Sequence, residues 1–183
     1  MKDLLLVVDM QNVYLKNQKW ACLDTEGCAE RIVSLIKSKR FDDVVFTKFI
    51  ADPQASGVWA DYNKKYADVN ASDFANAMVS GLDEVISEYP VYQKSVYSSL
   101  AVPEVLEKCR NADRVFVAGV VAECCVLSTV LNLIDLGIYT VYVKDCISGL
   151  DRPKEEATEL ILSGLSPLHV LVCTSGSLPG DVQ

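Results

Sequence analysis

Residues 113–145 read DRVFVAGVVAECCVLSTVLNLIDLGIYTVYVKD and divide into three parts. Residues 113–121 and 139–145 are short, nearly unbroken apolar runs, and residues 123–137 have the length of an amphipathic helix that ends at a glycine. Unbroken runs of this length are typical of strands buried on both faces of a sheet. The stretch therefore predicts a strand, a crossover helix and a second strand parallel to the first.

The same alternation extends over most of the chain. Further apolar runs occupy residues 3–9, 43–49 and 168–174, and residues 89–95 look like a short strand. Amphipathic stretches of helix length occupy residues 26–40, 103–111 and 152–165. Residues 50–73 show no clear period. Six strands alternating with helices predict an α/β, three-layer fold with a six-stranded parallel sheet and helices on both faces. No linker or repeat interrupts residues 1–183, so we expect a single domain.

Composition excludes several classes of partner. Seventeen basic residues against 25 acidic residues give a net charge of −8, which argues against nucleic acid or an anionic membrane as the main partner. No apolar run approaches the roughly 20 residues that span a bilayer. The run at residues 4–8 is also too short for the core of a signal peptide. We therefore expect a cytoplasmic protein. The composition does not argue against a small-molecule substrate.

The cysteines and the histidine restrict the chemistry further. The seven cysteines are irregularly spaced and mostly lie in apolar segments, which indicates free thiols in a reducing compartment. The only histidine, His169, lies in the predicted strand 168–174 and is expected in the core. One histidine cannot form a multi-histidine zinc site.

Reactive side chains occur at the ends of three predicted strands. Asp9 ends the first, Lys94 lies at the end of the third, and Cys124 and Cys125 follow the fourth. The carboxyl ends of strands in an open parallel sheet line the ligand crevice. An acid, a base and a thiol are therefore expected to meet at one edge of the sheet.

That grouping would support nucleophilic catalysis. A cysteine in the first turn of a helix lies near unpaired backbone N–H groups, and these together with the Lys94 ammonium are expected to lower its pKa. The thiolate could attack an acyl carbon while the same N–H groups hold the oxyanion. Asp9 could take the thiol proton and pass it to a leaving amine. Periodicity alone does not decide between Cys124 and Cys125.

Three blocks of sequence carry a resemblance to a known family. LLLVVDMQNVY (residues 4–14), VYQKSVYSS (91–99) and the long block from residue 115 to residue 148 resemble the signature blocks of the isochorismatase-like cysteine hydrolases. This superfamily includes nicotinamidases and N-carbamoylsarcosine amidohydrolase. The resemblance covers most of the chain and is weakest in residues 50–73. It implies a Rossmann-like fold, a Cys–Asp–Lys triad and a homo-oligomer.

The resemblance also assigns roles to residues. The family nucleophile directly precedes a valine, which implies Cys125 as nucleophile, with Asp9 as acid/base and Lys94 as the lysine. Cys124 then occupies a variable position. A cis peptide bond, frequent in the family, would fall at residues 121–122. The oxyanion would be held by the backbone around Val121, Ala122 and Cys125.

Two departures from the family pattern narrow the substrate. Ala122 replaces a frequent threonine, which removes a hydroxyl group but no backbone donor. Nicotinamidases carry an Asp-x-His…His metal cluster after the second strand, whereas this chain has Asp52 there and no histidine. The resemblance therefore implies no metal and no cofactor, and it argues against nicotinamide as substrate. A cysteine at the nucleophile position also disfavours isochorismate hydrolysis.

These observations predict a metal-independent cysteine hydrolase that cleaves a C–N bond of a small amide through a thioester on Cys125. Gln11 could orient the site or be a loop amide in solvent, and Trp59 and Tyr62 could bind substrate or pack a long loop. The alternatives are a hydrolase of a ureido or ester bond, a catalytically silent metabolite-binding protein, and a thiol redox protein that uses both adjacent cysteines.

Overall fold

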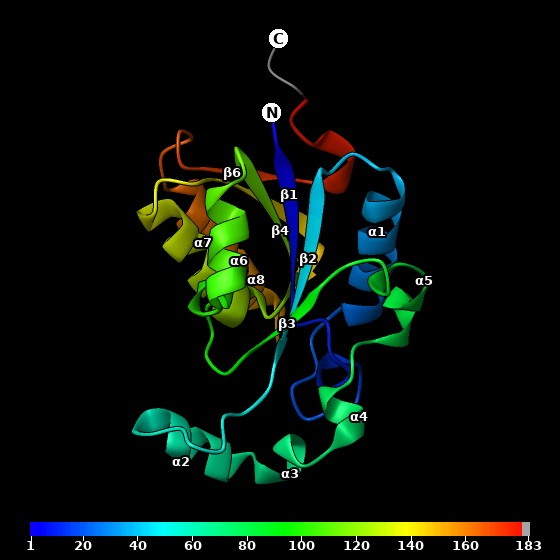
Figure 1. The fold of residues 1–183 in the computed structure, drawn as a ribbon, viewed down its shortest axis with the longest axis vertical. Coiled ribbons are helices and arrows are strands. Elements are labelled where there is room, and N and C mark those ends of the chain that lie inside the picture. The colour runs from blue at the N-terminus through cyan, green and yellow to red at the C-terminus, as the bar shows by residue number, and fades with distance from the viewer. Residues whose placement is uncertain (181–183) are drawn as a thin grey trace.

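The computed structural model describes residues 1–180, and its centre is one six-stranded sheet (Figure 1). The strands are β1 (Asp3–Val8), β2 (Asp43–Phe49), β3 (Val91–Lys94), β4 (Arg114–Val120), β5 (Tyr139–Ser148) and β6 (Val170–Cys173). Their order is β3-β2-β1-β4-β5-β6, and every neighbouring pair is parallel. The predicted α/β fold with a six-stranded parallel sheet is confirmed.

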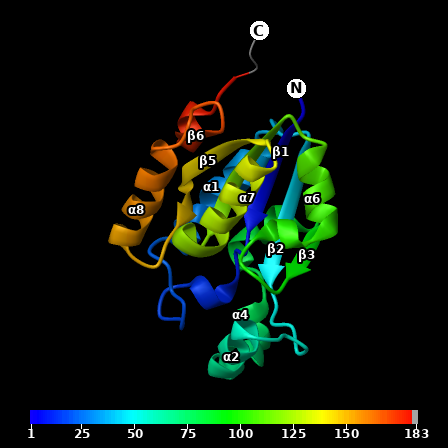
Figure 2. The same ribbon diagram turned by 90° about the vertical axis from the view of Figure 1, so that its left-hand side faces the viewer.

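Helices cover both faces of this sheet. Helix α1 (Thr25–Lys37) packs on one face, and α6 (Pro103–Arg110), α7 (Leu127–Asp135) and α8 (Arg152–Ser163) pack on the other (Figures 1 and 2). Successive β1 side chains therefore enter two cores: Leu5 lies in the cluster that contains Ile32 of α1, and Leu6 in the cluster that contains Leu133 of α7. Burial on both faces explains why the β1 sequence is apolar without alternation.

The helices begin at residues suited to the task. The Asp24 carboxylate accepts a hydrogen bond from the Gly27 N–H and caps α1, and the Asp151 carboxylate caps α8 through the Lys154 N–H. Such caps satisfy N–H groups that have no partner within the helix. No helix within residues 1–180 combines the length and apolar character needed to cross a membrane.

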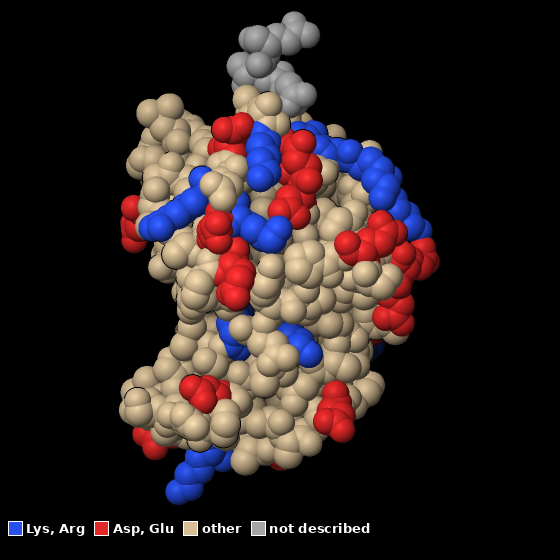
Figure 3. All heavy atoms as spheres, viewed as in Figure 1, with Lys and Arg blue, Asp and Glu red and all other residues tan. Residues whose placement is uncertain are grey.

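The segment between β2 and β3 contains four short helices: α2 (Val58–Lys65), α3 (Ala67–Asn70), α4 (Asp73–Asn76) and α5 (Asp83–Ile86). Helices α2, α3 and α4 lie beyond the carboxyl ends of the strands (Figure 1). Short 3-10 turns occupy Asn12–Tyr14, Ser80–Leu82, Ser99–Ala101 and Ser175–Ser177. The surface is hollowed between α2 and the helices above it in the view of Figure 3.

The last strand differs from its predicted extent. Strand β6 begins at Val170, which pairs with Thr140, so His169 precedes the strand. His169 is exposed, and Leu168 is 83% exposed. The predicted core position of His169 is therefore wrong. The physical reason is local, because the His169 N–H donates to the Ser166 carbonyl and closes a turn there.

Candidate active site

Asp9, Lys94 and Cys125 meet at the carboxyl edge of the sheet. The Lys94 Nζ atom lies 2.6 Å from Asp9 Oδ2 and 3.4 Å from Cys125 Sγ. The side chains of Asp9 and Lys94 are fully buried, and Cys125 is 4% exposed. Strands β1, β3 and β4 thus bring together an acid, a base and a thiol. The roles assigned to them from the resemblance remain a prediction.

Neighbouring residues orient the Asp9 carboxylate. The Thr47 hydroxyl of β2 donates to Asp9 Oδ1 at 3.0 Å, and the Asp9 N–H donates to the Thr47 carbonyl at 3.1 Å. The Ser99 hydroxyl lies 3.3 Å from that of Thr47. Asp9 itself has a left-handed backbone with φ of 50°. Sequence reasoning missed Thr47 and Ser99, although a threonine within the apolar β2 run is a detectable signal.

Lys94 carries its positive charge in a buried position. Burial acts to lower the pKa of its ammonium, but the charges of Asp9 and Cys125 more than offset that effect and hold the pKa above its ordinary value. The Val96 carbonyl also accepts a hydrogen bond from Nζ at 2.9 Å. The ammonium is therefore fixed between the carboxylate and the sulfur.

Cys125 lies in a π-helical turn, Ala122–Val126, which precedes α7. The predicted single helix over residues 123–137 is thus two elements. The Val126 N–H donates to the Val121 carbonyl at 3.1 Å, and the Thr129 hydroxyl donates to the Cys125 carbonyl at 2.7 Å. Such a turn re-aims side chains within a helix.

The pKa of Cys125 departs from the expected direction. Burial raises the pKa of this thiol and the Asp9 carboxylate raises it further, while Lys94 only partly opposes them. The predicted lowering is therefore wrong, because the thiol loses more solvation on burial than the ammonium restores. A thiol with a raised pKa favours its protonated form, so its use as a nucleophile would require a proton acceptor.

The backbone between β4 and the thiol is also shifted from its predicted form. The cis peptide bond joins Val120 and Val121, one residue before the predicted position at residues 121–122. Strand β4 ends at Val120, so the chain leaves the sheet at this bond. The Cys124 N–H donates to the Val121 carbonyl at 3.0 Å, so it is already engaged within the protein.

A cavity of about 480 Å³ opens beside the thiol. It is lined by Tyr14, Lys19, Trp20, Ala21, Tyr62, Tyr66, Tyr97, Val121, Cys124, Cys125 and Leu150. Its aromatic rings pack on one another, with centroids 5.2 Å apart for Trp20 and Tyr66 and 4.7 Å apart for Tyr62 and Tyr66. Sequence reasoning missed Tyr14 and Trp20. Tyr14 ends the first signature block, and that position was its only signal.

The three predicted substrate-binding residues have different positions. Tyr62 lines the cavity, whereas Trp59 packs against Tyr62 with a centroid distance of 5.4 Å and does not line it. Gln11 is buried and also lies outside the lining. Its amide donates to the carbonyls of Phe49 and Asn76 at 3.0 and 3.2 Å and accepts from the Phe49 N–H at 2.7 Å. Through these hydrogen bonds Gln11 connects the end of β2 to the end of α4.

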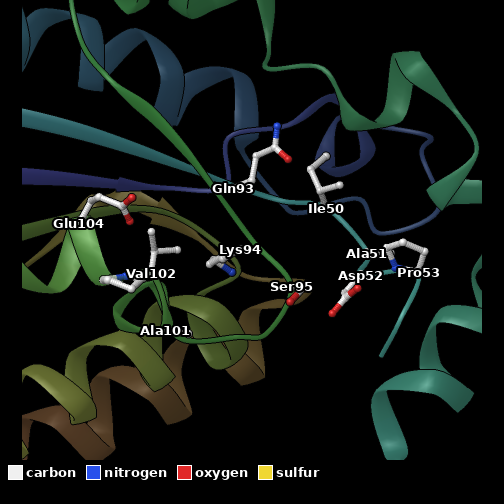
Figure 4. Close-up of a pocket in the computed structure, with 11 residues that line it drawn as sticks. Ile50, Ala51, Asp52, Pro53, Gln93, Lys94, Ser95, Ala101, Val102 and Glu104 are labelled. Atoms are coloured by element: carbon white, nitrogen blue, oxygen red, sulfur yellow. The ribbon is translucent and has the colours of Figure 1, made fainter. Parts of the chain in front are cut away.

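A second cavity, of about 440 Å³, lies along the edge strand β3 (Figure 4). In that view Lys94 lies between Glu104 of α6 and Asp52 of the loop after β2. Neither Asp9 nor Cys125 lines it. Asp52 accepts a hydrogen bond from the Gln54 N–H at 2.8 Å, and no group of three or more His, Cys, Asp or Glu side chains in the described 180 residues is placed to hold a metal. The residues here do not fit a nicotinamidase-type metal cluster.

Comparison with solved structures places this arrangement among known folds. The chain is similar to a cysteine hydrolase from Pseudomonas syringae pv. phaseolicola 1448A, with a TM-score of 0.78 and 18% identity over 96% of this chain and 89% of that one. It is similar to a nicotinamidase from Bacillus subtilis, with a TM-score of 0.76 and 18% identity over 94% and 99%. A MAR1 ribonuclease from Caenorhabditis elegans gives a TM-score of 0.70 and 17% identity over 96% and 78%.

At these identities the structural likenesses show the fold alone. No curated protein matches the chain. The model of the isochorismatase domain family, in contrast, matches residues 3–174 and so includes Asp9, Lys94 and Cys125. With nearly the whole described chain inside that match, the protein belongs to the isochorismatase domain family.

Proposed function

We propose that this protein is a metal-independent cysteine hydrolase that cleaves a C–N bond of a small amide through a covalent thioester on Cys125. Family membership supports hydrolase chemistry in general. The observation that carries the specific proposal is the buried contact of Lys94 with both Asp9 and Cys125, beside a cavity that reaches the sulfur. The cavity has the size of small-molecule sites.

In the first half-reaction Asp9 accepts the thiol proton as the sulfur attacks the amide carbon. Burial and the Asp9 charge raise the pKa of Cys125, so in this mechanism the sulfur becomes nucleophilic only as Asp9 accepts its proton. The backbone N–H groups of Ala122 and Cys125 would hold the oxyanion, since that of Cys124 already donates to Val121. The C–N bond then breaks, and Asp9 delivers its proton to the leaving amine.

In the second half-reaction water attacks the thioester. Asp9, again a carboxylate, accepts a proton from that water, the carbon–sulfur bond breaks, and the proton returns to the Cys125 sulfur. The Lys94 ammonium stays charged throughout. It stabilises the Asp9 carboxylate and the sulfur whenever either is negative, which is consistent with its raised pKa.

A pair of cysteine variants tests the proposal. Cys125→Ala is expected to abolish ammonia release from small amides, and Cys124→Ala to spare most of it. Mass spectrometry of the Cys125 peptide after exposure to amides, ureides and esters would identify the acyl group and the bond cleaved. Equal loss of activity in both variants would refute a unique Cys125 nucleophile.

A further inference from the structure

The polar side chains that line the cavity are mostly hydrogen-bond donors. Besides the two thiols they are four phenols, the Trp20 indole and the Lys19 ammonium. Indole and ammonium groups donate only, and a protonated phenol donates readily. Among the lining residues of the described chain there is no Asp, Glu, Asn or Gln. A ligand rich in acceptor oxygens is therefore complementary to this cavity.

The Tyr14 hydroxyl is the deepest of these donors. Tyr14 is 4% exposed, like Cys125, and it lines the cavity together with that thiol. Burial raises the pKa of Tyr14, and the charges of Cys125 and Asp9 raise it further, so the phenol keeps its proton. A protonated phenol that lines the cavity can donate a hydrogen bond to an acceptor oxygen of a ligand.

Lys19 is the charged residue of the cavity lining, and it is partly open to solvent. Its side chain is 46% exposed and pairs at 2.7 Å with Asp68, whose side chain is 64% exposed. Asp68 does not line the cavity, and an exposed pair of this kind holds its ammonium only weakly. The ammonium can therefore meet a second carboxylate. It also disfavours a cationic ligand, which the aromatic rings alone would have suited.

We infer that the substrate is an acid amide, in which the scissile group lies at Cys125 and a carboxylate on the acyl chain is bound by Lys19 and the neighbouring phenols. This inference rests on the proposed hydrolase function and adds the substrate class. A cavity lined both by the buried phenol of Tyr14 and by the exposed ammonium of Lys19 matches a molecule with oxygen acceptors at both ends.

Succinamate and butyramide provide a matched pair of probes, because they differ only in the terminal carboxylate. The ratio of their kcat/KM values for ammonia release is expected to favour succinamate by about 10- to 100-fold, the range for a charged hydrogen bond. Lys19→Met should bring the ratio close to one. Lys65→Met is the control, because the ammonium groups of Lys19 and Lys65 both lie over the Tyr66 ring, at 5.7 and 5.2 Å from its centroid, but Lys65 does not line the cavity.

Binding separates this inference from the proposed function. Calorimetry with Cys125→Ala should show that succinamate binds and that Lys19→Met in the same background weakens it at least tenfold. Binding through Lys19 without any hydrolysis by the intact protein would support the substrate class and refute the hydrolase. Hydrolysis of butyramide as fast as succinamate, or absence of binding by succinamate and by its malonyl and glutaryl homologues, would overturn the substrate class.

Discussion

The Cys125 thiol receives opposing influences from its two charged neighbours. Burial and Asp9 raise its pKa, and Lys94 lowers it, with the raising effects dominant. A hydrolase built this way does not store a thiolate at rest. In the proposed mechanism a thiolate forms only when Asp9 takes the proton, so Asp9 would suppress the resting reactivity of the thiol while being required for turnover.

Asp9→Asn is therefore expected to change two measurements in opposite directions. Removing the carboxylate removes a charge that raises the thiol pKa and leaves Lys94 to favour the thiolate. Alkylation of Cys125 by iodoacetamide near neutral pH should accelerate, while ammonia release is lost for lack of a base. Peptide mass spectrometry gives the alkylation rate, with Cys124 in the same sample as reference. Slower alkylation of Cys125 in this variant would contradict the assigned influence of Asp9.

Lys94→Met is expected to destabilise the fold by about 3–5 kcal/mol, because it leaves the Asp9 carboxylate buried without its cation. The double variant with Asp9→Asn should recover part of that loss. Urea unfolding measures the free energies. Lys37→Met, which breaks the exposed pair with Glu84, is the control and should change stability little. A loss no larger for Lys94→Met than for Lys37→Met would show that the buried pair does not stabilise the fold.

At the scale of single residues, the sequence predicted which side chains meet but not the direction in which the thiol pKa shifts. Asp9, Lys94 and the adjacent pair of Cys124 and Cys125 follow from the rule that strand ends converge, whereas the choice of Cys125 rested on the family resemblance. The direction of the thiol pKa depends on how deeply the sulfur is buried, which no local pattern records. Tyr14 and Thr47 were missed because their roles arise from pairing and packing with distant segments.

Among the elements, β4 controls the approach to the thiol, and Gly119 controls the end of β4. Gly119 pairs with Val8 of β1 and has φ of +111°, where side chains are disfavoured. A Cβ atom there would lie 2.1 Å from the Val8 carbonyl oxygen. The next residue but one, Val121, lines the cavity, so the close approach of β1 and β4 sets the path of the chain into the site.

Gly119→Ala is expected to cost at least about 3 kcal/mol of unfolding free energy, because it combines a strained backbone with a clash against β1. Gly137→Ala separates the two effects. Gly137 has φ of +74° and open space around its would-be Cβ, so only the backbone cost of about 1–2 kcal/mol applies. Thermal or urea unfolding provides the comparison, and equal losses in the two variants would exclude the clash.

The elements differ in how well the sequence predicts them. The extent of β2 was predicted to the residue, and β1 to within one residue, because unbroken apolar runs record burial on both faces. Residues 50–73 showed no clear period, and they contain α2, the four-residue helix α3 and the first residue of the four-residue helix α4. A helix of about one turn is too short to show a period of 3.6 residues. That segment supplies Tyr62 and Tyr66 to the cavity wall, and of these two only Tyr62 was predicted.

On the scale of the whole molecule, the sheet separates two cores, and buried thiols lie in both. Cys28 and Cys146 belong to the core beneath α1, and Cys109 to the core beneath α6 and α7. All seven cysteines are free, as expected for packing residues. Burial raises the pKa of Cys28 and of Cys109 from 9.0 to about 12. The folded chain therefore holds thiol protons that the unfolded chain releases.

Stability is accordingly expected to fall as pH rises from about 9 to 12. Below pH 9 both states keep these protons, and above it the unfolded state alone ionises, which favours unfolding by about 1.4 kcal/mol per pH unit for each such thiol. Urea unfolding over this range under reducing conditions measures the slope. Cys109→Ala should reduce the slope of unfolding free energy against pH by the contribution of one thiol. Val105→Ala, in the same helix and core, should lower the unfolding free energy at every pH without changing that slope. Parallel curves for the two variants would mean that Cys109 ionises alike in the folded and unfolded states.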